Sequence, residues 1–437
     1  PKVDPVTMDF QFLPAGSDTL PASVPMPPMA LTTLEAAQNV HATTRQSCLV
    51  CHAGAAGGDG TKRGDLSKEN ADPSLAIDMH MSPAGQDLTC ADCHSATLAD
   101  GTGHRLRGRG LDLRPNDVPE RFTCDSGGCH SDRPHGDFSN RTGSSKDKHA
   151  MKVACQTCHI PSFAKAAVGT EVARDWQDPH PTAAACNGRG GWLPREDKDG
   201  LGSASLTPSY AWFDGTSEIY YLGEPLDGVP TIPLDAGIAA SFVGNFNAGD
   251  PAYVIGMPNG DVTSTSLGTK IYPMKEHWGK LARNDVDNTL VGHSTFEFFR
   301  TGSFCRAVAV GLGLDEVNAP VSSVCDGFPG DTEMPPNTSV AAVHTYQTIN
   351  HGVETADNAL GCSDCHGSTA RIDLQEDFGY ELKGPESQVC NQCHSPEDPM
   401  GFTGIHNRHV VREGKDCSVC HTFSRPERGL STSLNER

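Results

Sequence analysis

One pattern decides how this chain folds, and its first third carries that pattern four times: Cys48-Leu-Val-Cys51-His52, Cys90-Ala-Asp-Cys93-His94, Cys124-Asp-Ser-Gly-Gly-Cys129-His130 and Cys155-Gln-Thr-Cys158-His159. Two cysteines followed at once by a histidine form a covalent haem attachment site. The thiols add across two vinyl groups on one edge of a porphyrin, and the adjacent histidine then lies under the ring as an axial ligand of the iron. A structural zinc site would need four converging ligands, and it leaves the repeated Cys-His adjacency unexplained.

Three further copies lie near the C-terminus: Cys362-Ser-Asp-Cys365-His366, Cys390-Asn-Gln-Cys393-His394 and Cys417-Ser-Val-Cys420-His421. Chance predicts roughly 0.03 such motifs in a chain of this composition. The wider gap at Cys124/Cys129 must bulge, and its two glycines suit a bulge because they adopt turn conformations without steric cost. The sequence therefore predicts seven covalently bound c-type haems, each with its motif histidine as one axial ligand.

The composition predicts that these haems replace much of the ordinary core. Only 36% of the residues are hydrophobic and 6% aromatic, while Gly (46) and Pro (31) are abundant. Such a chain alone would lean towards disorder, but flat apolar rings clamped at two thioethers and two axial ligands crosslink it as disulfides crosslink small secreted domains. We therefore expect a multihaem cytochrome c made mostly of loops and short helices packed around haems, with little β-structure.

The spacing of the motifs divides the chain into four parts. Residues 1–47 are a proline-rich N-terminal arm, which either wraps a neighbouring surface or is disordered. Residues 48–160 form a four-haem region and residues 346–437 a three-haem C-terminal region. Residues 161–345 are a haem-free middle segment with short strand-like runs at 210–213 and 218–222.

Histidine supplies the expected ligand on the far side of each iron. Of the 19 histidines, 12 lie outside the motifs. Five of them precede a motif by 6 to 11 residues and are placed to ligate a neighbouring haem, although any one of them could be a surface residue. Bis-histidine ligation gives lower reduction potentials than His/Met ligation, which suits anaerobic respiration. The predicted distal ligands are His41, His80, His104, His135, His149, His277, His351, His406 and His409.

The net charge of −21 argues against a nucleic-acid partner and favours redox proteins or extracellular electron acceptors. No run of 18 apolar residues predicts a transmembrane segment. Covalent haem attachment takes place outside the cytoplasm, so we expect an exported protein, periplasmic or extracellular, whose signal peptide has been removed.

Three cysteines remain after 14 are assigned to haems: Cys186, Cys305 and Cys325. The last two close a loop of ordinary size, and an exported location favours a disulfide between them. Cys186 is then a free buried thiol, an eighth ligand or an intermolecular crosslink.

Several runs resemble the tetrathionate reductase family of octahaem c-type cytochromes. They occur in the same order as in that family, at residues 57–66, 78–81, 152–164, 210–215, 271–280 and 349–351. The resemblance implies a catalytic haem ligated distally by a lysine, and Lys62 is the residue similar to it. In the family that haem is attached upstream, whereas this chain has no motif before Cys48. Two additional C-terminal haems stand in its place, so the scaffold is kept and the known reductase site is lost.

Three functions follow from these features. The first is an electron-transfer conduit that polymerises into an extracellular cytochrome filament, with His41 or the pair His406/His409 ligating across the junction. The second is a haem-dependent reductase of a sulfur or nitrogen oxyanion, with Lys270, Lys275, Arg283 and Arg300 as cationic groups. The third is a periplasmic electron shuttle. We expect an electron carrier rather than an enzyme, and predict no catalytic residue.

Overall fold

The structure is a computed structural model, and it describes most but not all of the chain. The described residues are 2–3, 10–11, 43–54, 58–94, 123–125, 129–136, 146–182, 191–260, 269–314, 325–365, parts of 370–389, and 401–422, with gaps of one to three residues inside several of these ranges.

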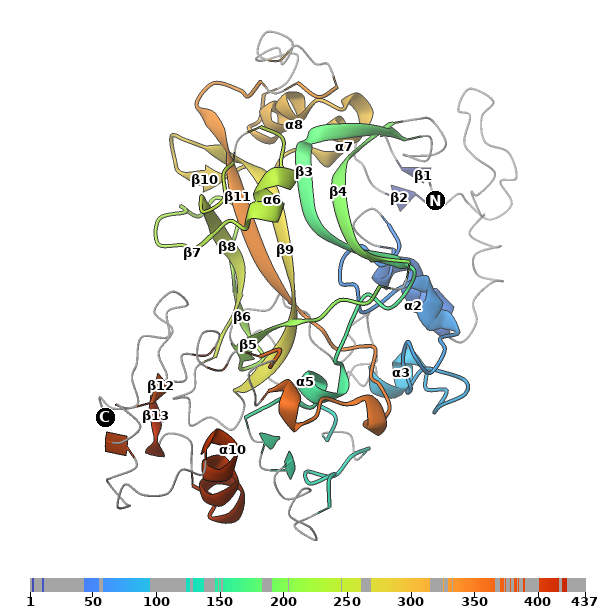
Figure 1. Cartoon of the computed structure of the whole chain (residues 1–437). Helices are drawn as coiled ribbons and strands as arrows, with labels where there is room; N and C mark the ends of the chain where they lie inside the picture. Colours follow the sequence, from blue (N-terminus) through green and yellow to red (C-terminus); the bar gives the residue numbers. More distant parts are fainter. Residues whose placement is uncertain are drawn as a thin grey trace, which may run out of the picture.

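A nine-stranded mixed sheet occupies the centre of the molecule (Figure 1). Its main path runs β4-β3-β9-β11-β8-β6, while β5 and β10 pair with β9 and β7 pairs with β8. The β3/β9 and β11/β8 pairs are parallel, and the other pairs are antiparallel. The strands are β3 (Val168–Thr182), β4 (Gly191–Leu201), β5 (Ser209–Phe213), β6 (Ser217–Ile219), β7 (Thr231–Pro233), β8 (Pro251–Pro258), β9 (Lys270–Asn284), β10 (Thr289–Leu290) and β11 (Thr338–Thr348).

The prediction of mostly loops and short helices with little β-structure is therefore wrong. The middle segment holds enough apolar material for a core of its own: Ala173, Trp278 and Ala342 from three strands bury their side chains together against Leu234 and Phe242. The long strands escaped prediction because polar residues interrupt them. Lys280, for example, is fully buried within β9, where it donates to Asp175 at 3.2 Å and to the Val243 carbonyl at 2.6 Å.

Three helices pack against the sheet: α6 (Ala236–Ser241), α7 (Thr295–Thr301) and α8 (Phe304–Gly311). The last two cover one end, where Phe298 and Phe304 bury their rings beside Trp176. Cys305 and Cys325 form a disulfide with a Cα–Cα distance of 5.8 Å, which confirms that prediction. Cys186 lies outside the described residues.

The elements that carry haem motifs are short and lie along the opposite end of the sheet (Figure 1). They comprise α2 (Arg45–His52), α3 (Cys90–Cys93), α5 (Cys155–His159) and the 3-10 turn η5 (Cys362–Asp364), accompanied by the 3-10 turns η2 (Lys68–Ala71) and η4 (Ala356–Asn358). A further group holds α10 (Gly401–His406), the π-helical stretch η6 (Asn407–Arg412) and the strand pair β12 (Glu381–Leu382) with β13 (His421–Thr422); β1 (Lys2–Val3) pairs with β2 (Phe10–Gln11).

Backbone contacts fasten these short elements to the sheet. The amide of Ala154 donates to the Ile271 carbonyl at 2.9 Å, and Thr157 Oγ1 donates to the same carbonyl at 2.8 Å, so α5 is anchored to the start of β9. Among the described residues, no helix is both long enough and apolar enough to cross a lipid bilayer.

Candidate haem-binding region

The first, second, fourth and fifth motifs lie in short helices or a 3-10 turn, which sets the relative position of the two thiols. Helix α2 begins after Thr44, whose side chain accepts the amide of Ser47 at 3.2 Å, and it carries Cys48 and Cys51 one turn apart. Residues three apart lie on the same side of a helix. Both thiols of such a motif therefore face the same side, as attachment to one porphyrin edge requires.

Within the described residues, four pairs of histidine rings have nearly the same distance between their ring centres. The ring centres are 6.1 Å apart in His80–His130, 6.1 Å in His94–His351, 6.2 Å in His135–His159 and 6.1 Å in His406–His421. Each pair joins one motif histidine to one histidine from outside the motifs.

This separation fits an iron between two imidazoles. With a metal–nitrogen bond of about 2 Å on each side and each ring centre about 1.2 Å beyond its nitrogen, the centres would be roughly 6.4 Å apart. No group of three or more His, Cys, Asp or Glu side chains in the described part of the chain could by itself hold a metal ion. Paired imidazoles supply only two ligands, and a porphyrin supplies the other four. The residues present therefore fit a haem, which contributes reversible one-electron chemistry at its iron when bound.

In each pair, the histidine from outside the motifs is called the partner histidine. Partner histidines come from different kinds of position. His80 precedes the second motif and meets the histidine of the third, as expected for ligation of a neighbouring haem. His351, just beyond the end of β11, meets His94 from a distant part of the sequence. His406 meets His421, which belongs to the motif that follows it.

A buried carboxylate, Asp78, holds two of these histidine segments together. Its Oδ1 accepts the amides of His80 at 2.8 Å and Met81 at 2.9 Å, and its Oδ2 accepts those of Gly352 at 2.7 Å and Val353 at 3.3 Å. Because one side chain ties both backbones, the positions of His80 and His351 are linked.

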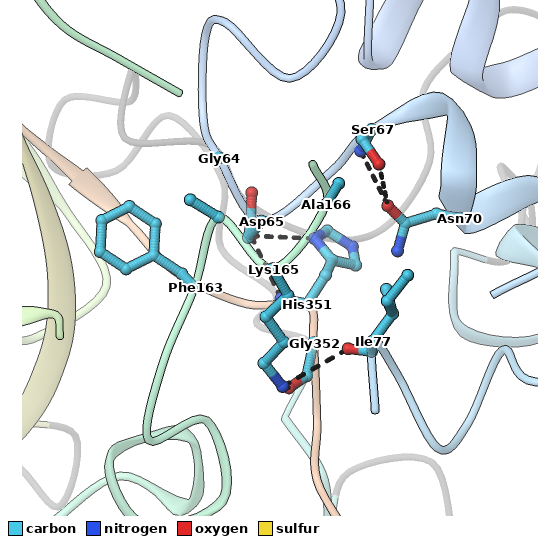
Figure 2. A pocket seen from close by; sticks show the side chains of 11 residues that line it. Gly64, Asp65, Ser67, Asn70, Ile77, Phe163, Lys165, Ala166, His351 and Gly352 are labelled. Carbon is cyan, nitrogen blue, oxygen red and sulfur yellow. Dashed lines mark hydrogen bonds and ion pairs between the residues drawn. The ribbon is translucent and has the colours of Figure 1, made fainter. Parts of the chain in front are cut away.

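A second buried carboxylate, Asp65, fixes the orientation of the His351 ring (Figure 2). Its Oδ2 lies 3.0 Å from His351 Nδ1 and accepts the amides of Asn350 at 2.9 Å and His351 at 3.1 Å. Burial raises the pKa of Asp65, but the hydrogen bond and charge of His351 and the charge of Arg63 lower it below its usual range. With Nδ1 engaged in this way, Nε2 of His351 is left for a metal.

The pocket in Figure 2 lies beside this contact and is lined by both Asp65 and His351. Lys165 closes one side, where Nζ donates to the Gly352 carbonyl at 2.7 Å and pairs with Glu354 at 2.9 Å. These bonds hold the segment after His351 against the segment that follows α5.

His135 has the same kind of partner as His351. Asp147, whose side chain is 2% exposed, places Oδ1 2.9 Å from His135 Nδ1 and accepts the His135 amide at 3.1 Å. Of the three carboxylates, the sequence singled out Asp78 and Asp65 only within the family resemblance, and Asp147 not at all. The local signal at Asp78 was its place two residues before a histidine, where an aspartate side chain can accept the backbone amide.

Thiols of successive motifs lie close together. Burial, followed by the charge and hydrogen bond of Cys48, raises the pKa of Cys90 to about 11. A hydrogen bond with Cys124 lowers the pKa of Cys155 to about 6. Burial and the charge of Cys129 raise the pKa of Cys93. The attachment points of the first four motifs thus form a continuous row.

Several predicted site residues have other surroundings or lie beyond the described part. His277 lies in β9, with Nε2 2.7 Å from Glu171 Oε1. His149 precedes α5, and His409 lies in the π-helical stretch with Nδ1 3.0 Å from the Ile405 carbonyl. His52 ends α2. The side chain of Cys362 and all of His41, His104, His366, Cys390, Cys393, His394 and Cys417 lie outside the described residues.

Two comparisons show which known proteins this chain resembles. A family model described as "Cytochrome c bacterial" matches residues 201–369. The chain is similar to the crystal structure of octaheme cytochrome c from Shewanella oneidensis, with 26% identity, a TM-score of 0.54 and coverage of 84% of this chain and 73% of that one. No curated protein matches. The family match and the structural likeness support a multihaem c-type cytochrome that transfers electrons.

Proposed function

We propose that this chain is an electron conduit that carries seven covalent haems, each with its iron between two histidines. The four histidine pairs at 6.1 to 6.2 Å carry this proposal, because each joins a motif histidine to a second imidazole and would leave no open position on the iron. An iron with six fixed ligands exchanges electrons without binding a substrate.

The row of thiols supports a path for electrons through the chain. Each thiol bonds an edge of its own porphyrin, so contacts between Cys48 and Cys90, and between Cys124 and Cys155, favour short distances between ring edges. The segment that leads into the fifth motif lies against the fourth, because the amide of Leu360 donates to the Cys158 carbonyl at 2.9 Å.

We propose an exported location and descent from the tetrathionate reductase family. The Cys305–Cys325 disulfide supports an oxidising compartment. The cationic groups of the reductase hypothesis do not gather at one site. Lys275 donates to the carbonyls of Thr61 and Lys62, Arg283 pairs with Asp285, and Arg300 pairs with Glu297. Lys62 itself is exposed.

The filament remains the specific form of the conduit that we propose, with other copies of this chain as partners. Its junction ligand would be His41, because His406 already faces His421 within the chain. Negative-stain microscopy of the purified holoprotein tests this form. Filaments that disappear in His41→Ala support it, and monodisperse particles of the unaltered protein would favour the periplasmic shuttle.

Ligation is tested by electron paramagnetic resonance (EPR) of the oxidised holoprotein. We expect low-spin ferric signals from every iron, and one new high-spin signal in His351→Ala. The matched control is His180→Ala, because His180 lies in the β3–β4 hairpin with 58% of its side chain exposed and should leave the spectrum unchanged. A high-spin signal in the unaltered protein would reject the conduit and favour the reductase.

A further inference from the structure

The partner histidines differ in what their second ring nitrogen touches. His351 and His135 each place Nδ1 against a carboxylate, Asp65 at 3.0 Å and Asp147 at 2.9 Å. Among the described residues, no protein group hydrogen-bonds the ring of His80, which faces His130 at the same centre-to-centre distance. The region therefore contains two kinds of partner histidine.

Both carboxylates are shielded from solvent, which strengthens their effect on the imidazole. The side chain of Asp65 is 0% exposed and that of Asp147 is 2% exposed. A charge buried in this way is screened weakly by water and salt. When a ligating histidine donates its other ring N–H to a carboxylate, the ligating nitrogen becomes more basic. A more basic ligand favours ferric over ferrous iron, and hydrogen bonding around a haem ligand is one of the means by which a protein sets the reduction potential.

We propose that Asp65 and Asp147 are positioning residues that lower the reduction potentials of the two haems ligated by the His94–His351 and His159–His135 pairs, relative to the haem of the His130–His80 pair. The inference rests on the proposed bis-histidine ligation. It assigns an uneven sequence of potentials to the relay, in which the second and fourth haems of the chain lie below the third.

The geometry separates this role from simple support of the loops. Asp78 is as well buried as Asp65 and accepts backbone amides from the same His351 segment, but within the described part of the chain its side chain bonds only backbone amides and no imidazole. Replacing Asp78 therefore removes a buried carboxylate and backbone support without removing a ring contact. Replacing Asp65 or Asp147 removes the ring contact as well.

The experiment is a potentiometric titration of the full holoprotein followed by visible absorbance, with EPR of each oxidised variant. We expect Asp65→Asn and Asp147→Asn each to raise the potential of one haem, about one-seventh of the absorbance change, by about 59 mV, which is a tenfold change in a one-electron equilibrium. Each variant should also change the g values of one low-spin signal. Asp78→Asn is the matched control for loss of a buried carboxylate and of backbone support, and it should shift the titration by clearly less than about 59 mV because no ring contact is lost.

The outcomes separate this inference from the function on which it depends. If His351→Ala yields no high-spin iron, the proposed ligation itself fails. If that ligation stands but both asparagine variants titrate like the unaltered protein, only the role of the carboxylates fails. An equal shift in Asp78→Asn would assign the effect to buried charge in general and overturn the proposal. Since Asp65 and Asp147 serve different haems, either variant alone decides the question if the other does not fold.

Discussion

In the sheet region, residues 168–348, strands of up to 15 residues bury aromatic and aliphatic side chains on several neighbours, whereas in the haem-bearing region, residues 43–160 and 349–422, the motif helices have only four to eight residues. Helix α3 buries none of its residues and α2 buries only Leu49. Helices this short are unstable alone. The difference indicates that the sheet stabilises itself, while the haem-bearing region depends on covalent attachment and on ligands.

Removal of the haems should produce the largest difference in folding between the two regions. Protein produced without haem attachment should keep the sheet region folded and lose the motif helices, because the sheet has its own core and the helices do not. Limited proteolysis followed by mass spectrometry should then cut within residues 43–94 and 123–136 and spare residues 168–348. Equal cleavage of both regions would contradict the idea that the sheet is self-sufficient.

The buried ion pair of the sheet should give the next largest effect. Asp175→Ala leaves the Lys280 ammonium buried without its carboxylate, so we expect a loss of about 3–5 kcal/mol in the free energy of unfolding. The measurement is denaturant unfolding of the holoprotein followed by tryptophan fluorescence. The control is Asp285→Ala, which removes the carboxylate from the partly exposed Arg283–Asp285 ion pair. It should cost about 0–1 kcal/mol of the free energy of unfolding. Similar losses in the two variants would mean that burial of the pair does not matter.

The Cys305–Cys325 disulfide should contribute somewhat less to the free energy of unfolding than the buried ion pair does. It links residues 20 positions apart, and constraint of the unfolded chain by a loop of this size is worth about 2–4 kcal/mol. The double variant Cys305→Ala/Cys325→Ala should lower the unfolding midpoint of the sheet region and leave the EPR spectrum of the haems unchanged. Altered haem signals would show that the two regions are coupled more tightly than their contacts suggest.

Lys275 should make stability depend on pH, with the smallest change for a single pH unit. Burial lowers its pKa from 10.5 to about 7, against the opposing charges of Glu171 and Asp65. Between these two values the unfolded chain binds the proton more tightly than the folded one, so stability should rise with pH from about 7 towards 10, by at most about 1.4 kcal/mol per pH unit. Thermal unfolding at several pH values measures this rise, and Lys275→Met should abolish it. Lys275 Nζ has three acceptors, the carbonyls of Thr61 and Lys62 and Thr170 Oγ1, so the absence of a rise over this range would mean that they keep it protonated.

The haem sites could be predicted from sequence because their chemistry is local. Two thiols and a histidine within five to seven residues predict an attachment site whatever the surrounding fold, and the bond between Cys305 and Cys325 followed from counting the cysteines that remained. The sheet could not be predicted from the sequence to the same degree. Strands β9 and β11 carry Lys275, Lys280 and His344 in buried positions, and such residues break the apolar pattern by which strands are recognised.

The sequence by itself indicated a multihaem protein and predicted which residues attach its haems, because covalent chemistry needs only neighbours along the chain. The tertiary structure alone decided which imidazoles face each other. His94 and His351, for example, are far apart in the sequence and are brought together where β11 ends. It also decided which of those imidazoles touch a carboxylate. A buried aspartate has no sequence signature for its partner, because the partner is set by packing across the fold and not by spacing along the chain.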